Sequence, residues 1–505
     1  METNKASEHF EEEDIHFRDQ WQFELKSDFL PHPSLKESTH TQEFFLFVPD
    51  SLQINPETYP KDFFYQDQTN LIRFKTPVFT LKNLIDPEEE KSPIFRIHHL
   101  QRSKISEANR ETLENELKLL GNIVRSALRL NVQMILKATE YSSLVQKLCE
   151  DIKNFKKVYR SLSLSFHQNW MDPAIDSHFS YVEEFINKSI HYYLISLKKN
   201  LPEDIPILDE VILQEIEESE KLDLEPLMGA GEALHNEYIL YRRGLLNKFV
   251  VDVLLLTCNR YSFLKTYQNI IGAIAAAIAM LFFFILYVWQ SQIVVINSTA
   301  FVVITVILYV LKDRIKDGIK EISYKMAFGL FPDYTTQILS PNKKITLGKL
   351  KESFSFASEE SLPQEIILAR NREFHFVLES FKRPEQVLYH KKTVTITQNP
   401  EFERGRRHGL NIIFRFHIQR FLAKASDPNY SYTTLDKTTK ELVEMELSKV
   451  YHLNIILRNT YISDDLSQKV ELKKYRIVVD KNGIKRIEFV DGSQLANNKS
   501  NLTIT

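Results

Sequence analysis

Several kinds of residue are scarce in this chain. Its 505 residues include 2 cysteines and 12 glycines. Cys149 and Cys258 are too few for a disulfide framework or for a metal site of their own. The low glycine content disfavours glycine-rich nucleotide loops. Because 64 basic residues stand against 67 acidic ones, the net charge is −3, and no positive field predicts nucleic acid as a partner.

Catalytic signatures are missing as well. The sequence contains no GxSxG, HExxH or Walker A motif, no set of kinase motifs and no zinc-ligand spacing. We therefore predict no metal and no cofactor, and the sequence favours a noncatalytic protein. The first 14 residues are acidic and polar, so a cleaved secretory signal is not expected.

Two long apolar runs dominate the middle of the chain. Residues 270–289 and 293–311 carry no charged side chain. As helices, these runs of about 20 residues would each extend about 30 Å, the thickness of a bilayer core. The sequence predicts a transmembrane helix at each run, with Gln290, Ser291 and Gln292 as the turn. The alternative is a pair of core helices in a large soluble domain.

Positive residues flank this pair of runs on both outer sides, while the turn between them has none. They are Arg242, Arg243, Lys248, Arg260 and Lys265 before the first run, and Lys312, Arg314, Lys316, Lys320 and Lys325 after the second. Positive residues are retained on the cytoplasmic side. We therefore predict a multi-pass protein of a cell (plasma or inner) membrane, with both termini in the cytoplasm.

Small residues in the first run recur at helical spacing. Gly272, Ala276 and Ala279 would let another helix approach closely, and Asn297 in the second run could hydrogen-bond across the pair. We predict that these residues pack the two helices together, with self-association as the alternative. The stripes of charge from Lys312 onward predict a cytosolic stalk helix over residues 312–330.

The N-terminal half divides into three predicted parts. Residues 1–40 are expected to be poorly ordered. Residues 41–105 form a small β-rich segment with strands at 44–49, 71–75, 77–81 and 94–100. Residues 106–268 form a cytoplasmic helical bundle, because their apolar residues recur with a period near 3.6, and the last helix, 234–267, leads into the membrane.

Residues 335–495 form a C-terminal β-rich domain. Apolar and polar residues alternate over 410–418, and Asn482-Gly483 lies between two alternating runs, as in a tight β-hairpin. Strands of this number and spacing predict an antiparallel β-sandwich or open barrel. The fold class is therefore membrane α+β.

One dense positive cluster is the candidate ligand site. Arg404, Arg406, Arg407 and His408 could recognise an anion, such as a phosphorylated ligand or anionic lipid headgroups. The simpler interpretation is a solvated turn between strands.

The leading functional prediction is a two-pass membrane protein that acts as a noncatalytic scaffold or signal-coupling protein. Its predicted partners are the lipid bilayer and either an unknown protein or a second copy. The first alternative is an oligomeric channel or membrane-perturbing effector gated by the cytoplasmic domains. The second is a membrane-tethered enzyme acting on a phosphorylated or lipid substrate.

Overall fold

The computed structural model describes residues 15–104, 106–202, 205–221, 233–296, 298–330, 332–342, 345–371, 385–399, 402, 406, 409–463 and 466–490. The chain forms two compact units. The first contains Met1–Ile72, Thr257–Asn399 and Ile412–Thr505, and the second contains Arg73–Leu256 and Pro400–Asn411.

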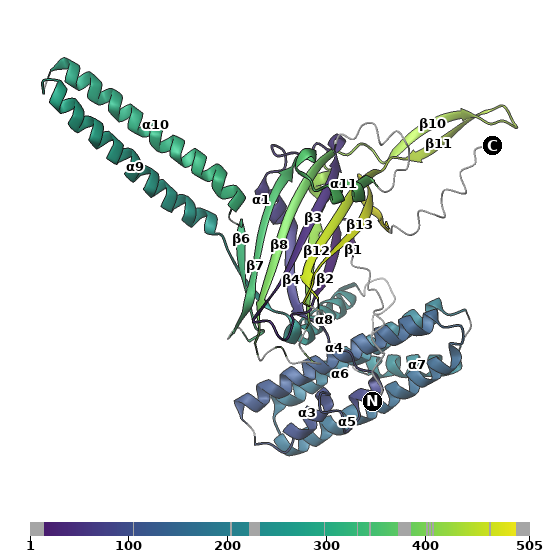
Figure 1. Cartoon of the computed structure of the whole chain (residues 1–505). Coiled ribbons are helices and arrows are strands. Elements are labelled where there is room, and N and C mark those ends of the chain that lie inside the picture. Colours follow the sequence, from purple (N-terminus) through teal and green to yellow (C-terminus); the bar gives the residue numbers. More distant parts are fainter. Residues whose placement is uncertain are drawn as a thin grey trace. The chain divides into compact units, whose positions relative to one another are not determined.

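An antiparallel sheet of eight strands forms the larger part of the first unit (Figure 1). Its order is β14 (Gly483–Phe489), β13 (Gln468–Asp480), β12 (Tyr451–Ile462), β3 (Glu37–Pro49), β8 (Glu385–Thr397), β7 (Thr346–Ala357), β6 (Tyr334–Leu339) and β5 (Thr257–Tyr261). The N-terminal strand β3 lies between two C-terminal strands, β12 and β8. The N-terminal strands therefore do not make the separate small sheet that we predicted.

A second sheet shares its core with the first. Its order is β1 (Ile15–Asp19), β2 (Gln22–Phe29), β9 (Leu410–His417) and β4 (Gln68–Phe74). Phe23 of β2 and Phe416 of β9 belong to one buried cluster with Phe44 of β3 and Leu453 of β12. Residues 15–40, which we expected to be poorly ordered, thus supply strands, because alternate side chains such as Phe23 and Leu25 are buried.

Smaller elements complete this unit. The helix α11 (Gln364–Asn371) covers the other face of the large sheet, where Ile366 packs with Phe45 and Phe47. The strands β10 (Asn429–Leu435) and β11 (Leu442–Ser448) pair only with each other within the described residues. Two short helices are α1 (Lys61–Asp67) and α12 (Gln419–Leu422). The first unit is therefore built mainly from antiparallel sheet.

Helices make up most of the second unit. They are α2 (Leu81–Leu84), α3 (Pro93–Leu100), α4 (Glu107–Lys137), α5 (Ser142–Trp170), α6 (Pro173–Asn200), α7 (Pro206–Glu220) and α8 (Ala233–Val251). The apolar face that predicted α4 is buried from Leu113 to Leu128. Ser106 and Asp172 cap α4 and α6 by accepting hydrogen bonds from backbone N–H groups. The described residues between Glu107 and Val251 are therefore mainly helical.

Three local predictions here were wrong. The predicted strand 77–81 is irregular chain that leads into the helix α2 at Leu81. The predicted strand 94–100 is the helix α3, because Ser92 caps its first turn and Pro93 suits the first helical position. The predicted helix 234–267 ends at Val251, and Thr257–Tyr261 is the edge strand β5, paired with β6. Strand pairing with a distant segment overrides the helical propensity of these residues.

The two apolar runs form an antiparallel helical hairpin, α9 (Phe263–Ile293) and α10 (Thr299–Leu330) (Figure 1). The predicted turn at 290–292 was wrong: α9 continues through these residues to Ile293, and α10 begins at Thr299. As predicted, α10 runs on through the charged segment 312–330 as a helix. Within the described residues, one segment, Asn269–Ile293, is long and apolar enough to cross a membrane.

Candidate functional site

The hairpin is held together by a seam of small and apolar side chains. Among the described side chains of α9, the buried apolar ones are Ile271, Ala275 and Ala279. A Cβ atom on Gly272 would lie 3.5 Å from Cε of Lys320 on α10. Gly272 therefore lies close to α10, and Ala279 is buried within the hairpin. The prediction for Ala276 was wrong: it is exposed, and Ala275 takes its place.

The other candidate packing residue, Asn297, lies outside the described residues. Polar groups near the turn nevertheless join the helices. Nε2 of Gln290 donates to the carbonyl oxygen of Phe301 at 2.8 Å and to Oγ1 of Thr305 at 3.2 Å. Because Gln290 turns inward in this way, α9 can extend through a segment that the sequence marks as a polar turn.

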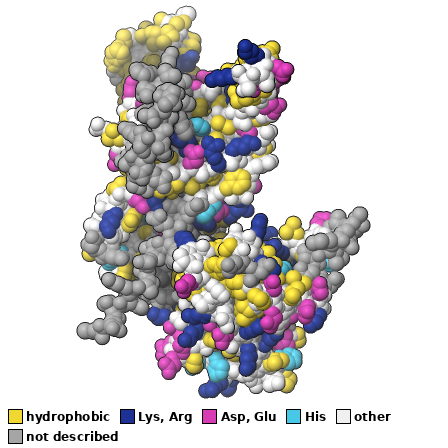
Figure 2. Space-filling model, turned by 90° about the vertical axis from the view of Figure 1, so that its right-hand side faces the viewer, with side chains coloured by type: hydrophobic (Ala, Val, Ile, Leu, Met, Phe, Trp, Pro, Cys, Tyr) yellow, Lys and Arg dark blue, Asp and Glu magenta, His cyan; other side chains and the backbone are white. Residues whose placement is uncertain are grey.

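The outward faces of the hairpin are apolar over much of its length. Leu281 is 64% exposed, Val288 54% and Val306 58%. Hydrophobic side chains cover the end of the hairpin, which is the uppermost part of the molecule in Figure 2. The other exposed large hydrophobic residues include Ile270, Ile274, Ile278, Phe284, Ile285, Trp289, Val302, Val303, Ile307 and Val310. Such a continuous surface is unusual for a protein in water.

The base of the hairpin is set directly into the large sheet. The strand β5 ends at Tyr261 and α9 begins at Phe263, while α10 ends at Leu330 and β6 begins at Tyr334. These two strands pair, with Tyr261 opposite Thr335. Oγ of Ser262 also donates to the carbonyl oxygen of Asp333 at 3.0 Å. The two ends of the hairpin are therefore tied together by strand pairing.

A buried carboxylate anchors this junction. Asp333 is 5% exposed, and its side chain accepts hydrogen bonds from Nζ of Lys61 at 2.6 Å, the hydroxyl of Tyr65 at 2.7 Å and the backbone N–H of Phe354 at 2.8 Å. Burial, followed by the Asp333 charge, raises the pKa of the Tyr65 hydroxyl. Tyr65 thus remains a hydrogen-bond donor to Asp333 at neutral pH.

A second buried carboxylate, Glu352 of β7, lies beside this junction. Its Oε1 accepts from Nε2 of Gln68 at 2.9 Å and from Nδ2 of Asn70 at 2.6 Å, and Nε2 of His390 lies 3.4 Å away. Burial alone would raise the pKa of Glu352. Hydrogen bonding and charge from His390, with Gln68 and Arg260, outweigh burial and hold the pKa at about 2. Glu352 is therefore ionised inside the protein.

A buried lysine, Lys392, is the strand-pairing partner of Glu352. Lys392 of β8 is 2% exposed, and its ammonium has no hydrogen-bond acceptor among the described residues. Its Nζ lies 5.2 Å from the ring centroid of Phe414. Burial lowers the pKa of Lys392 to about 8, and the charge of Glu352 opposes that shift. Lys392 is thus a costly charge in the protein interior.

A polar row continues across the sheet from Lys392. Register pairs place Asn459, Gln42, Lys392 and Glu352 side by side on β12, β3, β8 and β7. Nε2 of Gln42 donates to Oδ1 of Asn459 at 3.1 Å. His40 lies two residues before Gln42 on β3, so both side chains are on the same face of the sheet. Burial, followed by the Lys392 charge, lowers the pKa of His40 to about 4. His40 is therefore neutral at pH 7.

Sequence reasoning missed this buried row. Its residues come from four strands that are far apart in the chain, and pairing was unknown. One signal was available: polar His40 and Gln42 alternate with buried Phe44 in β3, so polar residues occupy inward positions of that strand. That irregularity marks a buried polar site but does not identify its other members.

Of the four residues of the predicted anion site, the structure describes Arg406 alone. Arg404, Arg407 and His408 lie outside the described residues. Arg406 is 3% exposed, and its NH2 lies 2.6 Å from Oε1 and 2.5 Å from Oε2 of Glu116, while NH1 donates to the carbonyl oxygen of Lys91 at 2.7 Å. The guanidinium is thus engaged inside the helical unit, and the prediction that Arg406 binds an external anion was wrong.

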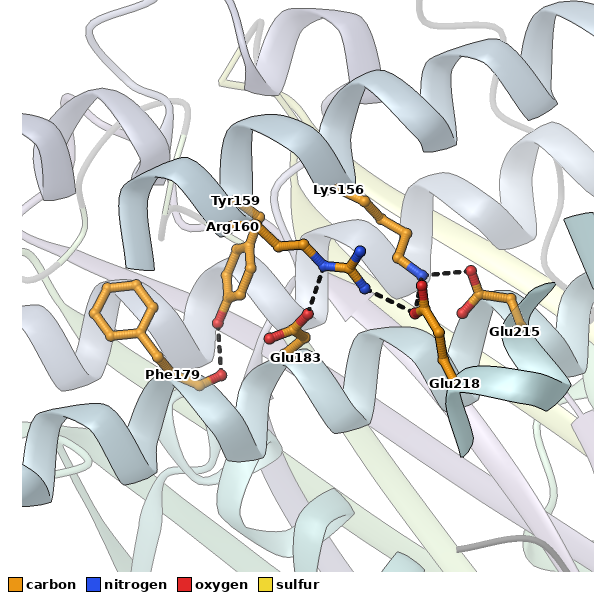
Figure 3. A network of polar contacts seen from close by, with 7 residues as sticks. All are labelled: Lys156, Tyr159, Arg160, Phe179, Glu183, Glu215 and Glu218. Atoms are coloured by element: carbon orange, nitrogen blue, oxygen red, sulfur yellow. Dashed lines mark hydrogen bonds and ion pairs between the residues drawn. The ribbon is translucent and has the colours of Figure 1, made fainter. Parts of the chain in front are cut away.

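A larger ion network links three helices of the second unit (Figure 3). Nζ of Lys156 on α5 contacts Glu215 and Glu218 of α7 at 2.5 Å and 2.8 Å. Arg160 reaches from α5 to Glu183 of α6 at 3.0 Å and also to Glu218 at 2.7 Å. Each side chain in this network has an ion-pair partner, so the network joins α5, α6 and α7.

Comparisons with known proteins give no family for this chain: no family model, no curated protein and no solved structure matches it.

Proposed function

We propose that this chain is a membrane-anchored, noncatalytic scaffold or coupling protein, in which the α9–α10 hairpin attaches the two-sheet unit to a bilayer. The observation that carries the proposal is the exposed apolar surface at the end of the hairpin. Transfer of a side chain such as Leu281 from water into hydrocarbon contributes roughly 1.5–3 kcal/mol. Many such side chains lie on this surface, so a bilayer accounts for it.

The base of the hairpin supports a coupling role. A tilt of the helices acts on β5 and β6 without an intervening flexible linker, because each helix is separated from its strand by only a few residues. Asp333 then connects this edge to Lys61 and Tyr65 of α1. A movement of the hairpin in the membrane would therefore reach the core between the two sheets.

The cations around the hairpin determine the proposed orientation. Lys312, Arg314, Lys316 and Lys320 all lie on the part of α10 that leads back to the sheet, and residues 294–298 at the turn carry no positive charge. Positive residues favour the cytoplasmic side. We therefore place the sheet unit and both termini in the cytoplasm, at a plasma or inner membrane, where a protein partner would bind.

Flotation with lipid vesicles tests membrane anchoring. The full chain should float with phosphatidylcholine and phosphatidylglycerol vesicles after high-salt washing. Leu281→Glu, Val288→Glu and Val306→Glu together should abolish flotation, because all three side chains are exposed on the hairpin. Leu442→Glu is the matched control, since Leu442 is 76% exposed on β11. Flotation of the triple variant at the wild-type level would refute the proposal.

A second variant separates anchoring from folding. Replacing residues 263–331 by a short glycine-serine linker should leave a folded protein, because Tyr261 and Thr335 pair directly at the base. This variant should keep a cooperative thermal unfolding transition and lose flotation. Protease treatment of sealed vesicles tests orientation. In inside-out membrane vesicles from cells, both units should be digested.

A further inference from the structure

At the same height along the hairpin, α10 carries charged residues where α9 carries apolar ones. The rings of Phe283 on α9 and Tyr309 on α10 have centroids 6.4 Å apart. Nearer the base, Gly272 faces Lys320. Both pairs give the same antiparallel register, so Lys312 of α10 lies level with Met280 of α9. The charged part of α10 therefore runs beside the apolar residues 272–280 of α9.

This register limits the length that is free of charge on both helices. On α10 the uncharged residues are 299–311, and the matching part of α9 is 281–293. At 1.5 Å per residue this section is about 20 Å long, while the bilayer core is about 30 Å thick. The shared apolar section thus falls short of the far side of the bilayer.

A double crossing would place charges deep in hydrocarbon. If Ile270 of α9 lay at the near boundary of the core, Lys312 would lie about 15 Å from it, at the bilayer centre. The charges between that point and the boundary are Lys312, Asp313, Arg314, Lys316, Asp317, Lys320 and Glu321. Each charged side chain costs about 2.5–3.5 kcal/mol at the centre of a spanning helix. A single hairpin has no second partner helix to shield them.

The turn of the hairpin has the character expected of a buried tip. Val295 is 79% exposed and Ile296 60% exposed. Several polar groups there are bonded within the hairpin: Oγ of Ser291 donates to the carbonyl oxygen of Val288 at 2.7 Å, and Oγ of Ser298 accepts from the N–H of Phe301 at 3.1 Å. These exposed aliphatic side chains at the turn suit hydrocarbon better than water.

We infer that the hairpin enters the bilayer from one side only and ends inside the hydrocarbon, in place of the double crossing that the sequence predicts. Lys312 lies at the near headgroup level, where its ammonium stands 3.8 Å from the ring centroid of Tyr309. The charged segment of α10 then lies among and above the lipid headgroups. This inference rests on the proposed membrane anchoring and adds the depth of insertion.

The depth of Trp289 distinguishes the two arrangements. Trp289 is 62% exposed and lies eight residues beyond Leu281. With entry from one side it lies about 12 Å inside the near boundary of the core, close to the bilayer centre. With a double crossing that begins at Ile270 it lies about 28 Å inside, at the far boundary. One fluorescent side chain therefore reports the depth.

Fluorescence quenching by brominated phosphatidylcholine in vesicles measures this depth. The full chain and its Trp289→Phe variant are compared, so that their difference isolates Trp289 from Trp21 and Trp170. We expect bromine near the acyl-chain ends to quench Trp289 at least twice as strongly as bromine near the headgroups. Stronger quenching by headgroup-proximal bromine would overturn the inference while leaving membrane anchoring intact. Absence of quenching by either lipid would refute both.

A lengthened hairpin supplies an internal control. Lys312→Leu, Asp313→Leu, Arg314→Leu and Lys316→Leu together extend the shared apolar section to about the thickness of the bilayer core. Trp289 should then move toward the far boundary, and quenching should shift to the headgroup-proximal lipid. A variant in which Lys312 and Asp313 are exchanged with each other keeps the first charges of α10 at the same height. It should therefore keep the stronger quenching by bromine near the acyl-chain ends. An unchanged pattern in the four-leucine variant would contradict a depth set by these charges.

Discussion

Replacing Lys392 by methionine should stabilise the two-sheet unit. The Lys392 ammonium is 2% exposed and has no hydrogen-bond acceptor among the described residues. Burial moves its pKa from the ordinary value of 10.5 to about 8. At about 1.4 kcal/mol per pKa unit, this shift corresponds to a cost of about 3 kcal/mol for holding the charge inside the protein at pH 7.

The methionine side chain has a similar length and no charge, so Lys392→Met removes that cost and keeps the packing. The contact of the ammonium with the ring of Phe414 is lost, at about 1 kcal/mol. The net expectation is a gain of about 1–3 kcal/mol in the free energy of unfolding. Lys391 is the matched control, because it is the adjacent residue of β8 and is exposed. Lys391→Met should change stability by less than about 0.5 kcal/mol.

Urea denaturation of the full chain in detergent, followed by Trp21 fluorescence, measures this effect, because Trp21 packs against the core of the two sheets. The pH dependence gives a second readout. Since Lys392 loses its proton at about pH 8 in the folded chain and near its ordinary value of 10.5 after unfolding, the advantage of Lys392→Met should shrink as pH rises between those values. A folded Lys392→Met variant less stable than wild type by more than about 1 kcal/mol would refute the reasoning.

Three further predictions concern stability. The pKa of Glu352 is about 2 in the folded chain against an ordinary value of 4.5. The contribution of Glu352 to stability should therefore be complete above pH 4.5 and be lost as the pH falls toward 2. Glu352→Gln should flatten acid unfolding curves over that range. Gly348→Ala should lower the free energy of unfolding by about 1–3 kcal/mol, because the new Cβ would lie 2.2 Å from the carbonyl oxygen of Thr395. Gly318→Ala, whose Cβ would have nothing within 4 Å, should be neutral or stabilising by up to about 1 kcal/mol. Thermal melts of both variants test this contrast. Glu116→Gln should lower the free energy of unfolding by about 3–5 kcal/mol, because it removes the carboxylate charge that the buried Arg406 guanidinium contacts. Glu114→Gln, which removes a more exposed partner of Lys118, should lower it by less than about 0.5 kcal/mol. Equal losses in urea titrations would contradict this explanation.

Local patterns predicted helices well and strand partners poorly. The period of Leu148, Ile152 and Phe155 in α5 marks a helical face, and all three are buried. The strand 410–418 was also correctly located as β9, although the alternation could not show that β9 belongs to the smaller sheet. The candidate site was less accessible to sequence reasoning. Arg406 stands in a dense run of cations, which suggests a solvated loop, yet Glu116 of α4 binds it in the interior.

The sequence by itself determined that residues 270–311 form a pair of long apolar helices and that the second continues as a charged helix. Both properties depend on neighbours a few residues apart, because helical periodicity and hydrophobic content are local. Only the tertiary structure decided which levels of the two helices lie side by side, and hence that Lys312 stands beside Met280. It also decided that β3 lies between β12 and β8, and that Lys392 is buried beside Glu352. These features depend on contacts between distant segments, whose choice of partner and register is not encoded in any local repeat.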